Sequence, residues 1–165
     1  MFRSIEDFQR DWAYESEATG KVLRALTDGA LGQRVYAEGR SLGRIAWHLV
    51  RSIVDFGEQA KLDGAGPDAN VPIPSAGQIV TEYERAANAI GKAVASAWND
   101  SMLPGEIEMF GQQWSRGSML SSLIRHQAHH RGQMTVLMRQ AGLPVPGVYG
   151  PAREEWKAYG QEPEE

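Results

Sequence analysis

Four long segments with apolar residues at helical spacing constrain the fold of this chain more than any other feature. They span about residues 5–26, 42–62, 75–98 and 119–140. Apolar residues that recur every three or four positions form one stripe along a helix, and four such stripes are buried together in a bundle. Every proline lies outside the four segments, as expected because proline interrupts a helix interior. We therefore predict an all-α fold built as a four-helix bundle.

Serine residues that suit helix capping stand at three of the predicted starts. Ser4 pairs with Asp7 at the first segment, and Ser41 precedes the second. Ser75 and Gln78 have the spacing of a capping box at the third, in which each side chain bonds to the other residue's backbone N–H. Local sequence therefore predicts where these helices begin.

The segments between the predicted helices differ in length and character. The link that follows the second helix, about residues 63–74, is too long for a tight turn and permits a crossover connection. Residues 106–110 alternate polar and apolar side chains, which is typical of a short strand or hairpin arm. A short last turn or helix is expected near Ala152, and no repeat or second domain is visible. We predict a single domain over residues 1–160 and a tail at residues 161–165.

Composition restricts the class of protein. A net charge of −4 argues against a broad surface for nucleic acid or for an anionic membrane. The absence of cysteine removes disulfides, thiolate metal ligands and cysteine nucleophiles, and it fits a reducing compartment. Residues 1–7 carry acidic side chains early with no following apolar run, unlike a signal peptide, and no stretch approaches the length of a membrane span. We predict a cytoplasmic protein with neither nucleic-acid nor membrane partners.

The four histidines of the chain occupy two short stretches of the predicted helices. His48 lies in the second helix, and His126, His129 and His130 lie in the fourth. His126 and His130 are four residues apart, so they share one face, whereas His129 faces elsewhere. His48 reaches them only if the second and fourth helices pack together. Three neutral imidazoles meeting inside a bundle would form a transition-metal site with open positions.

Several interpretations of these histidines compete. A metal would satisfy ring nitrogens whose burial without a partner costs about 1–3 kcal/mol each. Zinc, nickel and iron(II) all accept imidazole, and three protein ligands leave a position for water or substrate, as in catalytic sites. A second interpretation is a structural bundle in which the histidines are hydrogen-bonded core residues. A third and more distant interpretation is a haem held by two of the histidines. The motif differs from HExxH because Gln127 replaces the glutamate.

Five further residues carry a functional and a structural interpretation. Gln133, one turn from His130, can orient a ligand or a bound water. Asp55 is a candidate acceptor of a hydrogen bond from a metal-binding histidine, or a general base; its structural interpretation is a solvated or capping carboxylate. Arg131 suits an ion pair with a partner helix or a substrate carboxylate. Trp47, off its apolar stripe, suits a dimer contact or a pocket wall, and Tyr149 suits a cover over the site or ordinary packing.

Two motifs resemble the DinB/YfiT-like superfamily, whose name refers to DNA-damage-inducible proteins. One is His126-x-x-x-His130-Arg131-Gly132-Gln133 preceded by a histidine in the second helix; the other is the Gly-Leu-Pro-x-Pro-Gly-x-Tyr-Gly run at residues 142–150. The resemblance covers nearly the whole chain. It implies a bundle with up-down-down-up topology and a crossover, often assembled as a homodimer. It also implies a divalent metal held by three histidines, here His48, His126 and His130; His129 matches no ligand position.

The same resemblance implies a class of reaction. Some members of the superfamily are transferases or isomerases that bind a low-molecular-weight thiol at the metal and add it to an electrophile. We therefore expect a metal-dependent enzyme of thiol-transferase or isomerase type, or a hydrolase, that acts on a small molecule. Nickel or zinc is the expected metal, ahead of iron or manganese, and the thiol is separate from this cysteine-free chain. The alternative is a metal-binding stress-response protein without turnover.

Overall fold

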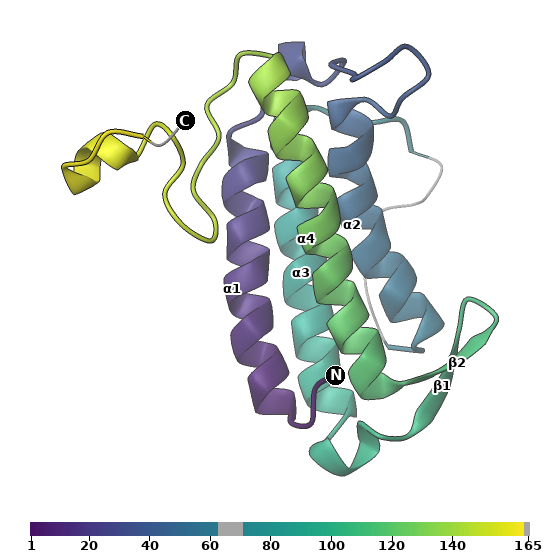
Figure 1. Ribbon diagram of the computed structural model, residues 1–165. Helices are drawn as coiled ribbons and strands as arrows, with labels where there is room; N and C mark the ends of the chain where they lie inside the picture. Colours follow the sequence, from purple (N-terminus) through teal and green to yellow (C-terminus); the bar gives the residue numbers. More distant parts are fainter. Residues whose placement is uncertain (63–70, 164–165) are drawn as a thin grey trace.

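The computed structural model describes residues 1–62 and 71–163, and within them four long helices lie side by side (Figure 1). These helices are α1 (Ile5–Arg24), α2 (Leu42–Gln59), α3 (Ala76–Ala97) and α4 (Arg116–Gln140). The predicted all-α, four-helix bundle is confirmed. Of the predicted tail at residues 161–165, the last two residues lie outside the described part of the chain.

The bundle has the predicted up-down-down-up topology. In Figure 1, α1 and α4 run upward, whereas α2 and α3 both run downward. Helices α1 and α2 each pack against both α3 and α4, so α1 and α2 occupy opposite corners of the bundle. Because α2 and α3 run in the same direction, the end of α2 and the start of α3 lie at opposite ends of the bundle, as the expected crossover requires (Figure 1). Residues 63–70 of the predicted link lie outside the described residues.

The helix starts follow the predicted capping chemistry. Ser4, Ser41 and Ser75 each accept a hydrogen bond from the backbone N–H three residues later, and Gln78 completes the capping box at the start of α3. Ser115 makes the same contact at α4, so that helix begins earlier than predicted. Helices α1 and α2 end slightly before the predicted residues 26 and 62.

A β-hairpin joins α3 to α4 at the lower end of the bundle (Figure 1). Its strands, β1 (Glu106–Met109) and β2 (Gln112–Ser115), pair antiparallel. The predicted strand corresponds to β1, whereas β2 was not predicted. The two-residue turn places Phe110 and Gly111 at φ 50° and 76°, the left-handed conformations that a tight hairpin turn requires. A short 3₁₀ helix at Trp156–Tyr159 matches the expected last turn.

The apolar side chains of all four helices form one continuous core. The predicted buried face of α4 is confirmed, because Leu123, Met134 and Leu137 are buried. Two polar residues on the same helix, Gln127 and Arg131, are buried as well, which the apolar pattern did not predict. Among the described residues, no helix has both the length and the apolar character needed to cross a membrane.

Candidate metal centre

Three histidine rings meet at the interface between α2 and α4. His48 comes from α2, and His126 and His130 come from successive turns of α4. The Nε2 atoms of His48 and His126 are 3.3 Å apart, and one nitrogen from each of the three rings lies within 4.8 Å of the others. His129, predicted to face elsewhere, is exposed. The structure therefore brings together the three histidines that the sequence selected.

A buried polar contact positions α4 against α2 beside these rings. The side-chain amide of Gln127 donates to the carbonyl oxygen of Leu49 and to Oγ of Ser52, both at 3.2 Å. Ser52 Oγ donates in turn to the same carbonyl at 2.9 Å. Gln127 follows His126 in the chain and Leu49 follows His48, so the contact holds the two histidine-bearing turns together. The signal in the sequence that could have indicated this contact is the position of Gln127: a polar residue four positions after Leu123 lies inside the apolar stripe of the helix.

The environment of the rings favours their neutral form. Burial, followed by the nearby histidines and by the Arg40 guanidinium, lowers the pKa of His48 and of His126 to about 4. Burial also lowers the pKa of His130, partly offset by a hydrogen bond from its ring to Gln133. At neutral pH the three rings are therefore uncharged and can offer nitrogen lone pairs to a metal.

Gln133 determines which nitrogen of His130 is available. Its Oε1 lies 2.7 Å from His130 Nδ1, and its Nε2 lies 3.2 Å from Nε2 of the exposed His129. An amide oxygen only accepts hydrogen bonds, so Nδ1 of His130 carries the proton and Nε2 has the free lone pair. This is the contact that an orienting role for Gln133 requires, since ring hydrogen bonds fix the tautomer of metal-binding histidines.

The donor set fits a divalent transition-metal ion. Zinc binds imidazole nitrogen at about 2.0–2.1 Å, so two ligands of a tetrahedral ion are about 3.3 Å apart. That separation equals the distance between the Nε2 atoms of His48 and His126. Three neutral imidazoles suit zinc, nickel and iron(II), and they leave a fourth position for a small molecule.

Cavities reach the cluster from two sides. The larger has a volume of about 470 Å³ and is lined by His130 and Gln133 together with apolar residues of α2 and α4. The smaller has a volume of about 210 Å³ and is lined by His48, Trp47 and Asp55 among others. An open site of this kind is what a catalytic metal requires, whereas a purely structural metal is enclosed by its ligands.

The structure gives Asp55 and Trp47 roles that the sequence left open. Asp55 pairs with Arg51 at 2.8 Å, and within the described residues it makes no hydrogen bond to a histidine ring. Asp55 therefore does not accept a hydrogen bond from a clustered histidine, because its carboxylate faces the arginine one turn earlier on α2. Trp47 is 3% exposed and forms part of the wall of the smaller cavity.

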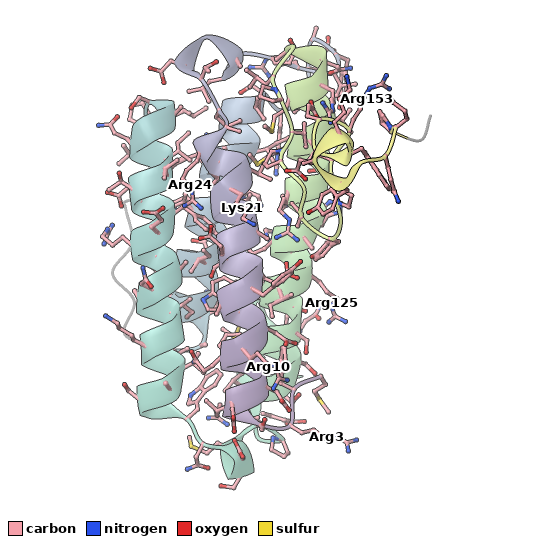
Figure 2. All side chains as sticks on the ribbon, turned by 90° about the vertical axis from the view of Figure 1, so that its left-hand side faces the viewer. Arg3, Arg10, Lys21, Arg24, Arg125 and Arg153 are labelled. Atoms are coloured by element: carbon pink, nitrogen blue, oxygen red, sulfur yellow. The ribbon has the colours of Figure 1, made fainter. Side chains whose placement is uncertain are left out.

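Arg131 belongs to a structural network on the opposite side of α4. Its guanidinium is buried and bonds to the Glu15 carboxylate at 2.8 Å, to Thr19 Oγ1 at 3.0 Å and to the Tyr149 hydroxyl. The Tyr149 hydroxyl also contacts Glu15 at 2.8 Å. Tyr149 therefore ties the C-terminal segment to α1 and α4, and Figure 2 shows this segment lying beside those helices. Of the interpretations considered for Arg131, the ion pair with a partner helix is the one observed.

The fold and the site together define a class: an up-down-down-up helical bundle that carries a cluster of three histidines on α2 and α4. Residues 1–165 match the model of the DinB family. The chain belongs to the DinB family, which confirms the resemblance identified from its histidine and glycine motifs.

Three known proteins are similar to this chain. It is 45% identical over 163 residues to a Bacillus subtilis (strain 168) protein described as uncharacterized protein YrdA, with 98% of each chain covered. The crystal structure of a DinB-like protein from Bacillus cereus ATCC 10987 matches with a TM-score of 0.86 and 43% identity, covering 90% of this chain and 100% of that one. The crystal structure of a DinB-like protein of B. subtilis, YjoA, matches with a TM-score of 0.66 and 13% identity, covering 86% of this chain and 97% of that one. At this identity the match shows the shared fold alone.

Proposed function

We propose that His48, His126 and His130 bind a divalent metal ion and that the protein is a metal-dependent enzyme of the thiol-transferase or isomerase type. The convergence of three rings, each with a lowered pKa, beside a cavity of about 470 Å³ carries this proposal. Nickel and zinc suit the all-nitrogen donor set best. Iron(II) is the next candidate, and manganese follows because it prefers oxygen ligands.

The metal would supply an activated nucleophile. When bound, a divalent ion lowers the pKa of a thiol or water in its open position, so that the deprotonated form is available at neutral pH. The chain has no cysteine, so a reacting thiol has to enter as a separate low-molecular-weight molecule. In a transfer reaction its sulfur forms a bond to an electrophilic carbon, and the leaving group departs with the electron pair.

The protein's own groups have distinct roles in this proposal. The histidines hold the ion, and Gln133 keeps the lone pair of His130 Nε2 directed toward it. The larger cavity has room for a small substrate beside His130. Asp55 shares the smaller cavity with His48, so we propose it as the base that receives a proton from the thiol. A homodimer and a cytoplasmic location, both expected from the sequence, are parts of the same proposal.

A metal-binding stress-response protein without turnover is the alternative function. It requires the same three ligands, and no substrate has to reach them. The two cavities beside His48 and His130 favour the enzyme, because a binder gains nothing from an open site.

Elemental analysis of protein purified without a metal-affinity tag tests the metal centre. We expect near-stoichiometric metal in the wild type and in His129→Ala, a matched control on the same helix, and its loss in His126→Ala. Absence of metal from the wild type before and after incubation with nickel or zinc would overturn the proposal. Metal-loaded protein is then assayed with a panel of thiols and electrophiles. Turnover that disappears in His126→Ala supports the enzyme, and metal binding without turnover supports the alternative.

A further inference from the structure

Arginine side chains frame both openings of the histidine cluster. Arg40 lines the cavity of about 470 Å³ together with His130, and it also lines the cavity of about 210 Å³ together with His48. Arg44 and Arg51 line the smaller cavity too. Arg40 therefore borders both cavities beside the histidines.

Two of these arginines carry charge that no described acidic residue neutralises through an ion pair. Arg51 pairs with Asp55 at 2.8 Å, and its side chain is 13% exposed. Arg40 and Arg44 are exposed, and neither forms an ion pair with any described residue. Glu38 lines a neighbouring cavity with both of them and forms no ion pair with either. The openings are therefore locally positive in a chain whose net charge is −4.

The position of these residues adds a second source of positive potential. Arg40 precedes Ser41, the N-cap of α2, and Arg44 lies in the first turn of that helix. The N-terminal end of a helix carries a partial positive charge that favours anions. The first backbone N–H groups of α2 are already bonded within the protein: that of Leu42 to Gln33, that of Gly43 to Leu31 and that of Arg44 to Ser41. The guanidinium groups are therefore the donors left for an anion.

We propose that Arg40 and Arg44 form a subsite for the carboxylate group of a small organic acid whose reacting end lies at the histidine cluster. This inference rests on the proposed function and extends it by naming the class of substrate. The carboxylate binds at the guanidinium groups, which match its geometry. From Arg40, which lines both cavities, the carbon skeleton extends along the apolar wall of the larger cavity, formed by Ile45, Val136 and Leu137.

Two small thiols that differ in charge test the subsite in protein loaded with cobalt(II) in place of the native metal. Mercaptosuccinate carries carboxylates, whereas thioglycerol is neutral. Binding is followed by the near-ultraviolet absorbance of the sulfur–cobalt contact at constant ionic strength. We expect the preference for mercaptosuccinate over thioglycerol, expressed as a ratio of dissociation constants, to be about tenfold lower in Arg40→Gln/Arg44→Gln than in the wild type. Any contact of a carboxylate with cobalt contributes to both proteins and cancels in this comparison.

Arg3→Gln/Arg153→Gln is the matched control, because it removes the same charge from residues that line neither cavity beside the histidines. Both side chains project from the face shown in Figure 2. The control should keep the wild-type ratio. An equal ratio in all three proteins that bind cobalt would overturn the subsite and leave the metal centre intact.

Two further arms separate the remaining outcomes. The first arm uses succinate to ask which reactant carries the carboxylate. If succinate competes with thioglycerol, the carboxylate belongs to the thiol. If succinate binds without competing, and its binding depends on Arg40 and Arg44, the carboxylate belongs to the electrophile. If no protein binds cobalt, the proposed metal function fails. Thermal unfolding of the metal-free protein then tests the subsite: a rise in Tm with mercaptosuccinate that is absent in Arg40→Gln/Arg44→Gln supports it, and no rise overturns it.

Discussion

The side-chain amide of Gln127 donates a hydrogen bond of 3.2 Å to the backbone carbonyl of Leu49, and each of these residues follows a clustered histidine in the chain. The bond joins α4 to α2 inside the core, where water does not compete for it. It sets the register in which His126 faces His48 at 3.3 Å. A residue that does not itself belong to the cluster thus bridges the two helical turns that carry His48 and His126.

Replacing Gln127 with leucine tests whether this hydrogen bond positions the histidine cluster. The free energy of unfolding of the metal-free protein should change by less than about 1 kcal/mol, because the variant loses a donor but also removes a buried amide oxygen that has no partner among the described residues. Zinc affinity should fall about tenfold, since the polar contact that positions the two histidine-bearing turns is lost. Urea titration measures the first quantity and chelator competition the second. Exposed Gln140→Leu is the control, and wild-type affinity in Gln127→Leu would contradict the prediction.

Gln133 should affect metal affinity through a different contact. Gln133→Leu removes the acceptor for His130 Nδ1, so either ring nitrogen of His130 can carry the proton and zinc affinity should fall about 10- to 100-fold. Gln133→Glu keeps an acceptor at the same place and should restore most of the affinity. Equal losses in both variants would show that Gln133 has another role.

The stability of the metal-free protein should depend on pH because of the clustered rings. The folded pKa of His48 and of His126 is about 4, below the 6.5 expected in the unfolded chain. Between these values the unfolded state binds more protons, so stability is highest above pH 6.5 and falls as the pH decreases toward 4. The free energy of unfolding measured from pH 4 to 7 should show this slope. His48→Gln/His126→Gln should reduce this slope, and the lowered pKa of His130 should leave the remainder.

The affinity for metal should also decrease as the pH falls, as the stability of the metal-free protein does. Protons compete with the metal for the ring nitrogens, so zinc affinity should decrease as the pH falls through the acidic range. Equilibrium dialysis at fixed free zinc measures the bound fraction. Binding that is independent of pH below 6 would indicate ligands other than these histidines.

The buried pair of Arg131 and Glu15 should be important for stability and not for metal affinity. Arg131 is 3% exposed, and removing one partner leaves the other charge buried, which costs about 3–5 kcal/mol. Glu15→Gln should therefore be strongly destabilising, whereas Glu15→Gln/Arg131→Met should cost less than the sum of the single changes. A double-mutant cycle in urea measures this coupling, and additive effects would contradict it.

Local signals in the sequence were sufficient for the helices and for two of the three histidines of the site. Ser4, Ser41 and Ser75 predicted three helix starts because capping depends on neighbours three residues away. His126 and His130 could be paired from their spacing, since one helical turn separates them. Strand β2 was missed because its residues, Gln112–Ser115, lack the alternation that marks a half-buried strand.

What the sequence determined by itself is a set of helices, their capped starts and the one face that carries His126 and His130. Only the packing of α2 against α4 brought His48 to that face, because the residues are 78 positions apart and no local pattern encodes the distance between them. The same holds for Gln127 with Leu49 and for Arg131 with Glu15, both buried polar contacts between different helices. Local hydrogen bonds and side-chain periodicity act within a few residues, whereas a site at a helix interface depends on burial of the whole core.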